Sequence, residues 1–203
     1  MVTDKHPRLI LASASVRRAD LLGTIGIVPD VIISPDIDET ELKSELPHQL
    51  AKRLAIAKNM AVCGQYQGDI VLTADTVIAV GRTILPKAET KSDFDLCMNY
   101  LSGGRHRAIT AIAICNPAGR MTHRVVTTRV KVKRLTDNDI KNFYETHEWH
   151  GKAGGYALQG YFGQFVEMIN GSYTGIIGLP LCETAKMLYS SGYHYNVNHT
   201  VSP

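Results

Sequence analysis

The sequence predicts an α/β fold in which at least part of the sheet is parallel. Short apolar runs alternate along the chain with stretches of helical periodicity, as expected for this fold class. The chain has 203 residues, of which 44% are apolar and 20% are charged, a composition typical of a globular protein with a sizeable core. We therefore expect residues 1–203 to form a single domain, with loose terminal segments at 1–7 and 193–203.

The first half of the chain predicts three strands and two helices. The apolar run Leu9–Ala12 is read as a strand and is followed by a helical pattern over 17–22. A second strand, Val31–Ile33, ends at a Ser-Pro turn, and a long helix follows over Pro47–Cys63, where the proline occupies a favoured first position. The strand Ile70–Val80 is the most hydrophobic of the chain and is the expected centre of the sheet.

The second half predicts a helix, a hairpin, a helix, a strand and a last helix. The first helix is expected over 92–101, and the hairpin pairs 108–115 with 121–133. A second helix is expected after Thr136, a strand over 165–169, and the last helix from Pro180. Gly103 suits the end of the first helix, and Thr136 suits the N-cap of the next. Along the second hairpin strand, Arg129, Lys131 and Lys133 alternate with apolar residues. This row could bind an anion, but we favour a solvated sheet face.

Charge, hydropathy and cysteine pattern narrow the function class. The net charge of +3 is too small to favour non-specific nucleic-acid binding. The N-terminal apolar run is shorter than that of a signal peptide, and no stretch approaches the ~18 apolar residues of a membrane helix. Cys63, Cys97, Cys115 and Cys182 lack metal-ligand spacing and lie in apolar stretches, so we expect free thiols that pack as small apolar side chains. We expect a cytoplasmic protein that binds neither nucleic acid nor membrane.

The segment Ser13–Arg18 has the pattern of an anion-binding loop. A strand, a loop of small residues and a helix N-terminus direct free backbone N–H groups at one point. Arg17 and Arg18 oppose the helix dipole, at a cost of up to ~1 kcal/mol each at an exposed site, and a bound phosphate would reverse that cost. Solvation of both arginines is the alternative, and we favour the phosphate interpretation because Ser13 and Ser15 can also donate.

Asp75 and Lys58 carry charge in apolar surroundings. Asp75 interrupts an apolar strand, so it is either paired or placed where the strand ends at a cleft, as a metal ligand or general base. A structural role, capping a turn through Thr76, is equally compatible with the sequence. Lys58 projects from an apolar helix stripe, and its ammonium either enters a cleft or extends to solvent, the more common outcome.

The glycine-rich segment 151–160 is neither a Walker loop nor a dinucleotide fingerprint. Its glycines permit close backbone approach to a ligand. Lys152 can meet a phosphate as a point charge, and Gln159 can read the hydrogen-bonding edge of a base. Together with the anion loop and Asp75, this segment indicates a nucleotide cleft.

Taken together, these segments resemble the Maf family of nucleoside triphosphate pyrophosphatases, over roughly residues 8–190. The matching motifs occur in the family's order, which is more specific than any one of them. They are Ser13-x-Ser15-x-Arg17-Arg18, Asp38-Glu39, Ala74-Asp75-Thr76-Val77, Gly104-Arg105-x-Arg107, Lys152 to Gly160, Gly171-Ser-Tyr, and Gly178-Leu-Pro-Leu181.

The resemblance implies an elongated mixed sheet flanked by helices, with two lobes around a nucleotide cleft. It implies hydrolysis between the α- and β-phosphates of a nucleoside triphosphate, with Mg²⁺ or Mn²⁺ as cofactor. Asp75 would be the proton acceptor, with Glu39 and Lys58 as its catalytic neighbours and with Asp75 and Glu39 as metal ligands. The resemblance also implies two sets of substrate contacts. Base selectivity is implied for Arg17, Thr76 and Gln159. Contact with the phosphates is implied for Ser13, Arg18, Lys58 and Lys87.

The glycine-rich segment resembles that of the family branch acting on dTTP and UTP. The chain departs from the family pattern at Val16, where proline is usual, and at Ala88 and Thr90, where the family has proline and aspartate after Lys87. The alternative function is a non-catalytic regulator that restrains cell division, which needs the cleft but not Asp75. A homodimer is the default expectation for such an enzyme.

Overall fold

The computed structural model describes residues 6–194 and contains a seven-stranded mixed sheet. The strand order is β2-β1-β3-β6-β7-β9, with β4 paired to β3. The pairs β1–β2 and β1–β3 are parallel, and all the others are antiparallel. The strands are β1 (Leu9–Ala12), β2 (Val31–Ile33), β3 (Ile70–Val80), β4 (Thr83–Leu85), β6 (Arg105–Cys115), β7 (Met121–Val132) and β9 (Val166–Asn170). The mixed α/β class with flanking helices is thereby confirmed.

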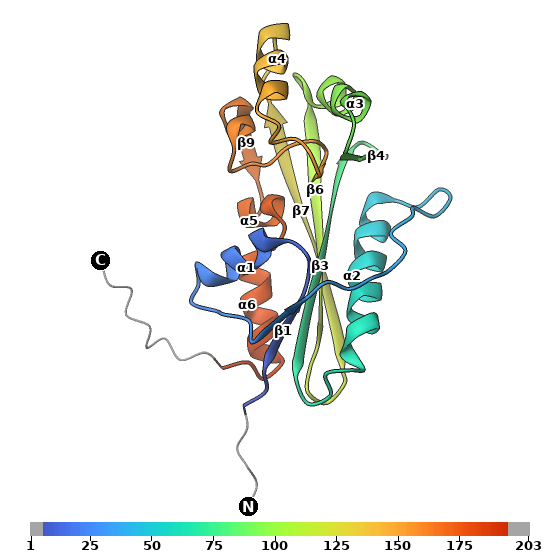
Figure 1. Cartoon of the computed structure of the whole chain (residues 1–203), viewed down its shortest axis with the longest axis vertical. Helices are drawn as coiled ribbons and strands as arrows, with labels where there is room; N and C mark the ends of the chain where they lie inside the picture. The colour runs from blue at the N-terminus through green and yellow to red at the C-terminus, as the bar shows by residue number, and fades with distance from the viewer. Residues whose placement is uncertain (1–5, 195–203) are drawn as a thin grey trace, which may run out of the picture.

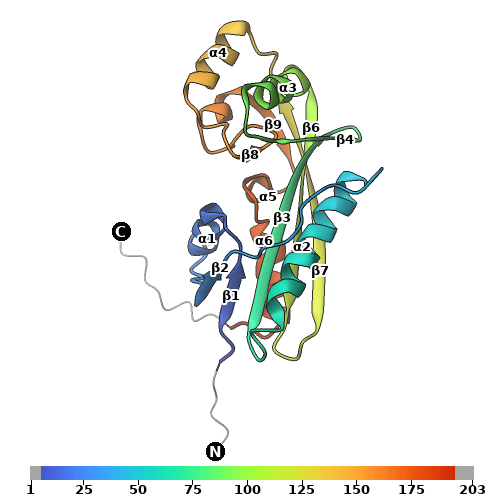
Figure 2. The same cartoon turned by 45° about the vertical axis from the view of Figure 1, so that its right-hand side comes forward.

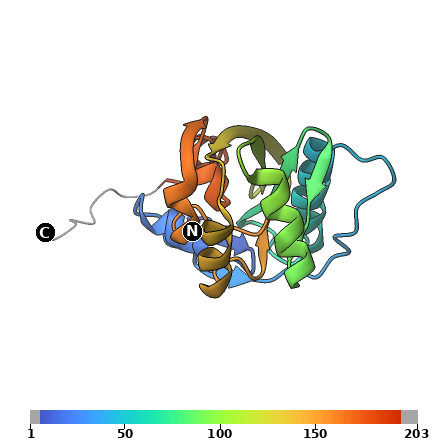
Figure 3. The ribbon, with the colours of Figure 1, turned by 90° about the horizontal axis from the view of Figure 1, so that it is seen from above.

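The three long strands β3, β6 and β7 form the spine of the molecule and run most of its length (Figure 1). Helix α2 (Pro47–Cys63) covers one face of the sheet, and α1 (Val16–Gly23), α5 (Tyr173–Ile177) and α6 (Leu181–Ser190) lie on the other (Figure 2). Helices α3 (Lys91–Leu101) and α4 (Asp137–Glu145) lie over one end of the sheet, as the view from above shows (Figure 3).

Successive β3 side chains point to opposite faces, which decides where each one packs. Leu72 and Ala74 join the cluster beneath α1 and α6, whereas Val77 and Ala79 join the cluster beneath α2. By the same alternation, Asp75 faces α2 and Thr76 faces the α5 side. Asp75 and Thr76, although adjacent in β3, therefore lie on opposite faces of the sheet.

The edge of β3 is open between its two short partners. On that edge β3 pairs with β1 over Ile70–Leu72 and with β4 over Ile78–Val80, while β6 occupies the other edge throughout. Residues 73–77 therefore have no strand beside them on this side. The loop that leaves β1 and the loop that precedes α2 both reach this opening, which provides room for a ligand within the sheet.

The structure decides between the alternatives left open for Asp75. This residue is paired, with Lys58, and it lies in the middle of β3, while Thr76 continues the strand because antiparallel pairing with β6 carries β3 on to Val80. Two other predicted details are wrong. Strand β6 begins at Arg105, three residues before the predicted start, since its pairing with β7 extends that far. Phe165 belongs to a 3₁₀ turn over Tyr161–Phe165 rather than to the next strand.

Besides this 3₁₀ turn, four short elements have no counterpart in the prediction. These are β4, β5 (Lys87–Ala88), β8 (Lys152–Ala153) and α5. Strands of two or three residues carry no periodicity, and β5 and β8 exist only because they pair with each other across 64 residues of sequence. Such elements cannot be predicted from their own residues, because they form only when a distant segment pairs with them.

The cysteines and the termini complete the comparison with the prediction. All four cysteines are free thiols, but Cys182 is exposed on α6 and does not pack as an apolar side chain, because its position on the helix faces outward. The terminal segments expected to be loose lie largely outside the described residues. No helix among residues 6–194 is long and apolar enough to span a membrane.

Candidate active site

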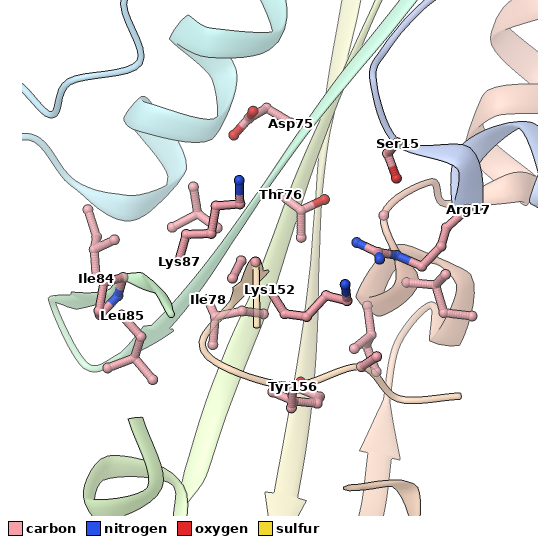
Figure 4. A pocket seen from close by; sticks show the side chains of 18 of the residues that line it. Ser15, Arg17, Asp75, Thr76, Ile78, Ile84, Leu85, Lys87, Lys152 and Tyr156 are labelled. Carbon is pink, nitrogen blue, oxygen red and sulfur yellow. The ribbon is translucent and has the colours of Figure 1, made fainter. Parts of the chain in front are cut away.

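The opening beside residues 73–77 of β3 leads into a cavity of about 280 Å³ that adjoins a second one around the β1–α1 loop. The ten residues predicted to contact substrate, metal or the reacting water all line one or both of these cavities: Ser13, Arg17, Arg18, Glu39, Lys58, Asp75, Thr76, Lys87, Lys152 and Gln159. Figure 4 shows Asp75 and Lys87 on one side of the first cavity and Ser15 and Arg17 on the other.

The most strongly charged part of the cavity is the carboxylate–lysine cluster, formed by Glu39, Lys58 and Asp75. The Lys58 ammonium lies 2.6 Å from Asp75 Oδ1 and 2.7 Å from Glu39 Oε1. Lys58 and Asp75 are 9% and 7% exposed, whereas the Glu39 side chain is half exposed. Burying an unpaired ion would cost several kcal/mol, so this pairing allows both charges to remain inside.

Helix α2 holds Lys58 in this position through its neighbour. Asn59 Nδ2 donates to the carbonyl oxygens of Val71 (2.8 Å) and Ala113 (3.1 Å), which joins the helix to β3 and β6. The Thr73 hydroxyl donates to the Ala55 carbonyl at 2.7 Å. These buried hydrogen bonds fix the rotation of α2, so that Lys58 faces Asp75 and does not extend to solvent.

The acidic loop before α2 positions Glu39. Arg53 forms two hydrogen bonds to the Glu45 carboxylate, at 2.7 and 2.8 Å, and a third to the Thr40 carbonyl at 2.9 Å. The backbone N–H of Thr40 donates to Asp38, and the Thr40 side chain first, followed by this backbone bond, lowers the pKa of the Asp38 carboxyl. The loop is thus fastened to α2 on both sides of the glutamate.

The loop after β1 and the first turn of α1 combine partly buried cations with hydroxyl groups. Arg18 donates from one terminal nitrogen to Ser13 Oγ (2.8 Å) and from Nε to the Gly178 carbonyl (2.9 Å). Burial lowers the pKa of Arg18, and the charge of Asp75 opposes that effect. Arg18 is therefore held against the cavity wall by two hydrogen bonds and is partly buried. Ser15 is the N-cap residue of α1 without a side-chain capping bond, which leaves its hydroxyl available to a ligand.

Two lysines form the basic rim, which we define as Lys87 on β5 and Lys152 on β8. The two strands pair, with Lys87 opposite Ala153. Burial, followed by the charges of Arg17 and Lys87, lowers the pKa of Lys152. In Figure 4 the Lys152 side chain extends across the cavity toward Arg17. With Arg17 beside them, these two lysines make this side of the cavity cationic, which favours an anionic ligand.

The glycine-rich segment requires glycine for a steric reason. Gly154 has φ of +65°, and a Cβ atom there would lie 2.7 Å from Ile78 Cγ2. The Gly154 N–H donates to the Pro86 carbonyl at 2.9 Å. This close approach holds β8 against β3 and places the basic rim over the open edge of the sheet.

Asp75 and Glu39 also bear on metal binding. Among residues 6–194, no three His, Cys, Asp or Glu side chains are arranged to hold a metal ion. Mg²⁺, however, is commonly bound by one or two carboxylates, with substrate phosphates and water completing its shell. Asp75 and Glu39 supply such hard oxygen ligands, and both carboxylates meet at the Lys58 ammonium. The donor set therefore fits a cation that arrives with a phosphorylated substrate.

Comparison with known proteins decides the family. The model of the family described as Maf-like protein matches residues 8–191. This chain belongs to the Maf family. The dTTP/UTP pyrophosphatase of Maricaulis maris is 52% identical over 188 residues, covering 93% of this chain and 90% of that protein. That of Caulobacter vibrioides is 48% identical over 187 residues, covering 92% and 97%.

Among solved structures, a nucleoside-triphosphatase / dITP/XTP pyrophosphatase from Mycobacterium abscessus matches with a TM-score of 0.42 and 13% identity, covering 90% of this chain and 93% of that one.

The two departures from the Maf pattern have local explanations. Val16 is the first residue of α1 and is 73% exposed, so the helix begins there without proline. Ala88 is fully buried, and Thr90 caps α3 by accepting a hydrogen bond from the N–H of Asp93. Lys87 itself is largely exposed and lies 3.3 Å from Glu89, so its side chain is free to move toward a ligand.

Sequence reasoning missed His106 and Thr110, both on the buried side of β6. His106 Nε2 lies 2.7 Å from the hydroxyl of Tyr156, which lines the cavity, and burial lowers the pKa of His106 to about 4. Thr110 donates to the Gly175 carbonyl at 2.7 Å, so at its 2.9 Å contact with Thr76 it is the acceptor. The signal available in the sequence was the alternation along 105–115, which places both side chains beneath the cavity.

Proposed function

We propose that this Maf protein hydrolyses dTTP and UTP between the α- and β-phosphates, releasing the nucleoside monophosphate and pyrophosphate. The observation that carries the proposal is the Lys58 ammonium held between Asp75 and Glu39, at an open sheet edge that faces Arg17 and Arg18. Carboxylates that can act on water thus lie opposite cations that can hold phosphates. The relatives named dTTP/UTP pyrophosphatase, at 48–52% identity, support the same substrates.

On the phosphate side, Arg18 and Ser13 are joined by a hydrogen bond and lie beside the N-terminus of α1. Their donors, together with Arg17 and the exposed ammonium of Lys87, would hold the triphosphate and neutralise its charge. Positioning and charge stabilisation supply most of the catalysis in phosphoryl transfer. Pyrophosphate is the leaving group that this cationic wall would stabilise.

At the reacting phosphorus, Asp75 would orient the attacking water and accept its proton. Lys58 offsets the negative charge of Asp75 and Glu39, which reduces their repulsion of the incoming triphosphate. Asp75 and Glu39 are also the residues that would hold Mg²⁺ or Mn²⁺, and the bound cation would supply further neutralisation of phosphate oxygens.

The base would lie in the deeper part of the cavity, between Thr76 and the glycine-rich segment. Gln159 presents an amide that can both donate to and accept from a pyrimidine edge. Tyr156 lines the same cavity and is held by His106. One hydrogen-bonding edge discriminates by only a few kcal/mol, so we expect dTTP and UTP to be preferred over other triphosphates rather than used alone.

The proposal is tested by identifying the products from a panel of triphosphates, with Mg²⁺, with Mn²⁺ and with EDTA. We expect pyrophosphate from dTTP and UTP, and its loss in EDTA. Asp75→Asn should bind nucleotide but turn over at least about 1,000-fold more slowly, whereas the matched surface variant Asp95→Asn should retain activity. Release of orthophosphate alone, or full activity of Asp75→Asn, would contradict the proposal. Binding without turnover in the unmodified protein would favour the regulator.

A further inference from the structure

Two cysteines meet at the end of the molecule away from the basic rim. Cys63 is the last residue of α2 and Cys115 is the last residue of β6, 52 positions later. Both pack in one apolar cluster with Val62 and Val71. Figures 1 and 2 show the C-terminal end of α2 beside the turn that joins β6 to β7. The fold therefore brings together two residues that are distant in sequence.

The two thiol groups share one apolar cluster and line one cavity. The pKa of the Cys115 thiol is raised by burial first and then by Cys63. The hydrogen-bonding contacts of both sulfur atoms are weak: Cys63 Sγ lies 3.9 Å from the Met60 carbonyl oxygen and Cys115 Sγ lies 3.8 Å from that of Asn116. Neither contact prevents the sulfur atoms from approaching each other.

A cavity gives small molecules access to this pair. It has a volume of about 350 Å³ and is lined by both cysteines and by the turns 64–68 and 116–119. Cys63 is partly exposed and Cys115 is buried. An oxidant entering the cavity therefore meets the more exposed Cys63 first, and Cys115 lines the same cavity.

We propose that Cys63 and Cys115 form a reversible modification site, at which a hydroperoxide converts the two thiols to a disulfide that links α2 to β6. The Cys63 thiolate attacks one peroxide oxygen, the O–O bond breaks, and Cys63 becomes a sulfenic acid while hydroxide leaves and takes up a proton as water. The Cys115 sulfur then attacks Cys63 Sγ, forming the S–S bond and releasing a second water. Two thiols are oxidised by two electrons, and one hydrogen peroxide is reduced to two waters.

The bond would join elements that are already in place. Asn59, one helical turn before Cys63, anchors α2 to the carbonyls of Val71 and Ala113, and Ala113 is two residues from Cys115. Because Lys58 lies on the anchored side, the disulfide is expected to leave the carboxylate–lysine cluster unmoved. Its effect is on the unfolded chain, where it closes a loop of about 50 residues and reduces conformational entropy.

The remaining two cysteines serve as internal controls. Cys182 is exposed on α6, so it can react with peroxide. Cys97 is buried against the glycine-rich segment, and burial raises the pKa of its thiol to about 12, which keeps it protonated and unreactive. If a disulfide forms between Cys63 and Cys115 although Cys182 is more exposed, the cause must be that the fold places Cys63 and Cys115 close together.

The test is peptide mapping of the whole protein after treatment with one equivalent of hydrogen peroxide, without reduction. Trypsin releases Cys63 in peptide 59–82 and Cys115 in peptide 108–120, so the disulfide appears as a linked pair about 2 Da lighter than the sum. We expect this pair to form, to disappear with dithiothreitol, and to be absent from Cys63→Ser and Cys115→Ala. Cys182→Ser should form it normally.

The second measurement is thermal unfolding, which does not depend on the proposed hydrolase activity. The oxidised protein is expected to melt about 5–15 °C higher than the reduced protein, and Cys63→Ser should show no such difference. The inference is overturned if the linked pair is absent while Cys182 is oxidised, or if the linked protein melts at the same temperature as the reduced one.

Discussion

Lys58 and Lys87 line the same cavity, yet their surroundings differ, and we therefore expect different roles for them. Lys58 is 9% exposed and is held by two carboxylates on a helix that buried hydrogen bonds anchor to the sheet. Lys87 is two-thirds exposed, lies on a two-residue strand and has one loose partner, Glu89. A charge that the fold holds in place before the ligand binds is expected to affect the chemical step, and therefore kcat. An exposed charge with one weak partner is expected to affect binding of the ligand, and therefore KM.

The largest expected effect is the loss of the organised charge. In Lys58→Met, Asp75 and Glu39 would face the triphosphate without a cation between them, and we expect kcat to fall by about 100- to 1,000-fold with a smaller change in KM. The comparison uses Lys52→Met, an exposed lysine on the same helix, which should retain activity. If Lys58→Met kept turnover within about threefold, the distinction between the two lysines would fail.

The next prediction concerns the close contact between Gly154 and Ile78, which positions the basic rim. Gly154→Ala would put a Cβ 2.7 Å from Ile78 Cγ2 at a positive φ, and we expect a loss of about 2–4 kcal/mol in the free energy of unfolding, measured with urea. Gly26→Ala is matched in φ, at +73°, but its Cβ would meet nothing within 4 Å. It should lose only about 1–2 kcal/mol. Equal losses in the two variants would show that contact with Ile78 is unimportant.

A third effect concerns pH. Burial depresses the pKa of His106 to about 4, against 6.5 for an ordinary histidine. Between pH 6.5 and 4 the unfolded chain binds a proton at this position that the folded protein does not. Stability should therefore fall as pH falls through that window, by at most about 1.4 kcal/mol per pH unit.

His106→Gln, whose amide can still reach Tyr156, is expected to flatten this part of the stability profile in equilibrium unfolding at several pH values. His150, which is exposed near Glu89, supplies the control substitution His150→Gln. Identical slopes for the unmodified protein and His106→Gln between pH 6.5 and 4 would show that another group is responsible.

The smallest effect is expected from removing the exposed charge of Lys87. Lys87→Ala should raise KM for the triphosphate by about 3- to 10-fold with kcat almost unchanged, and the increase should shrink at high salt because an exposed charge is screened. Lys91→Ala removes a similarly exposed lysine on α3 and should leave KM unchanged. A large fall in kcat for Lys87→Ala would mean that the rim also acts in the chemical step.

The sequence by itself predicted strand β3 and helix α2 with their observed bounds, because each carries many repeats of its own period. It also predicted the bounds of the short strands β1 and β2, which stand out as apolar runs between polar or turn-forming residues. It also singled out charged residues in apolar settings, Lys58 and Asp75 above all, since burial of a charge requires a partner. What it left open was the identity of that partner and whether Asp75 ended its strand.

Only the tertiary structure decided those points. The Asp75 partner is Lys58, because Asn59 fixes the rotation of α2 on the sheet, and the cavity exists because β1 and β4 leave the middle of β3 uncovered. Strands β5 and β8, the His106–Tyr156 contact and the meeting of Cys63 with Cys115 all join residues about 50 or more positions apart. Local periodicity carries no information about such pairs, because their stability comes from packing and hydrogen bonds that exist only when the whole chain is folded.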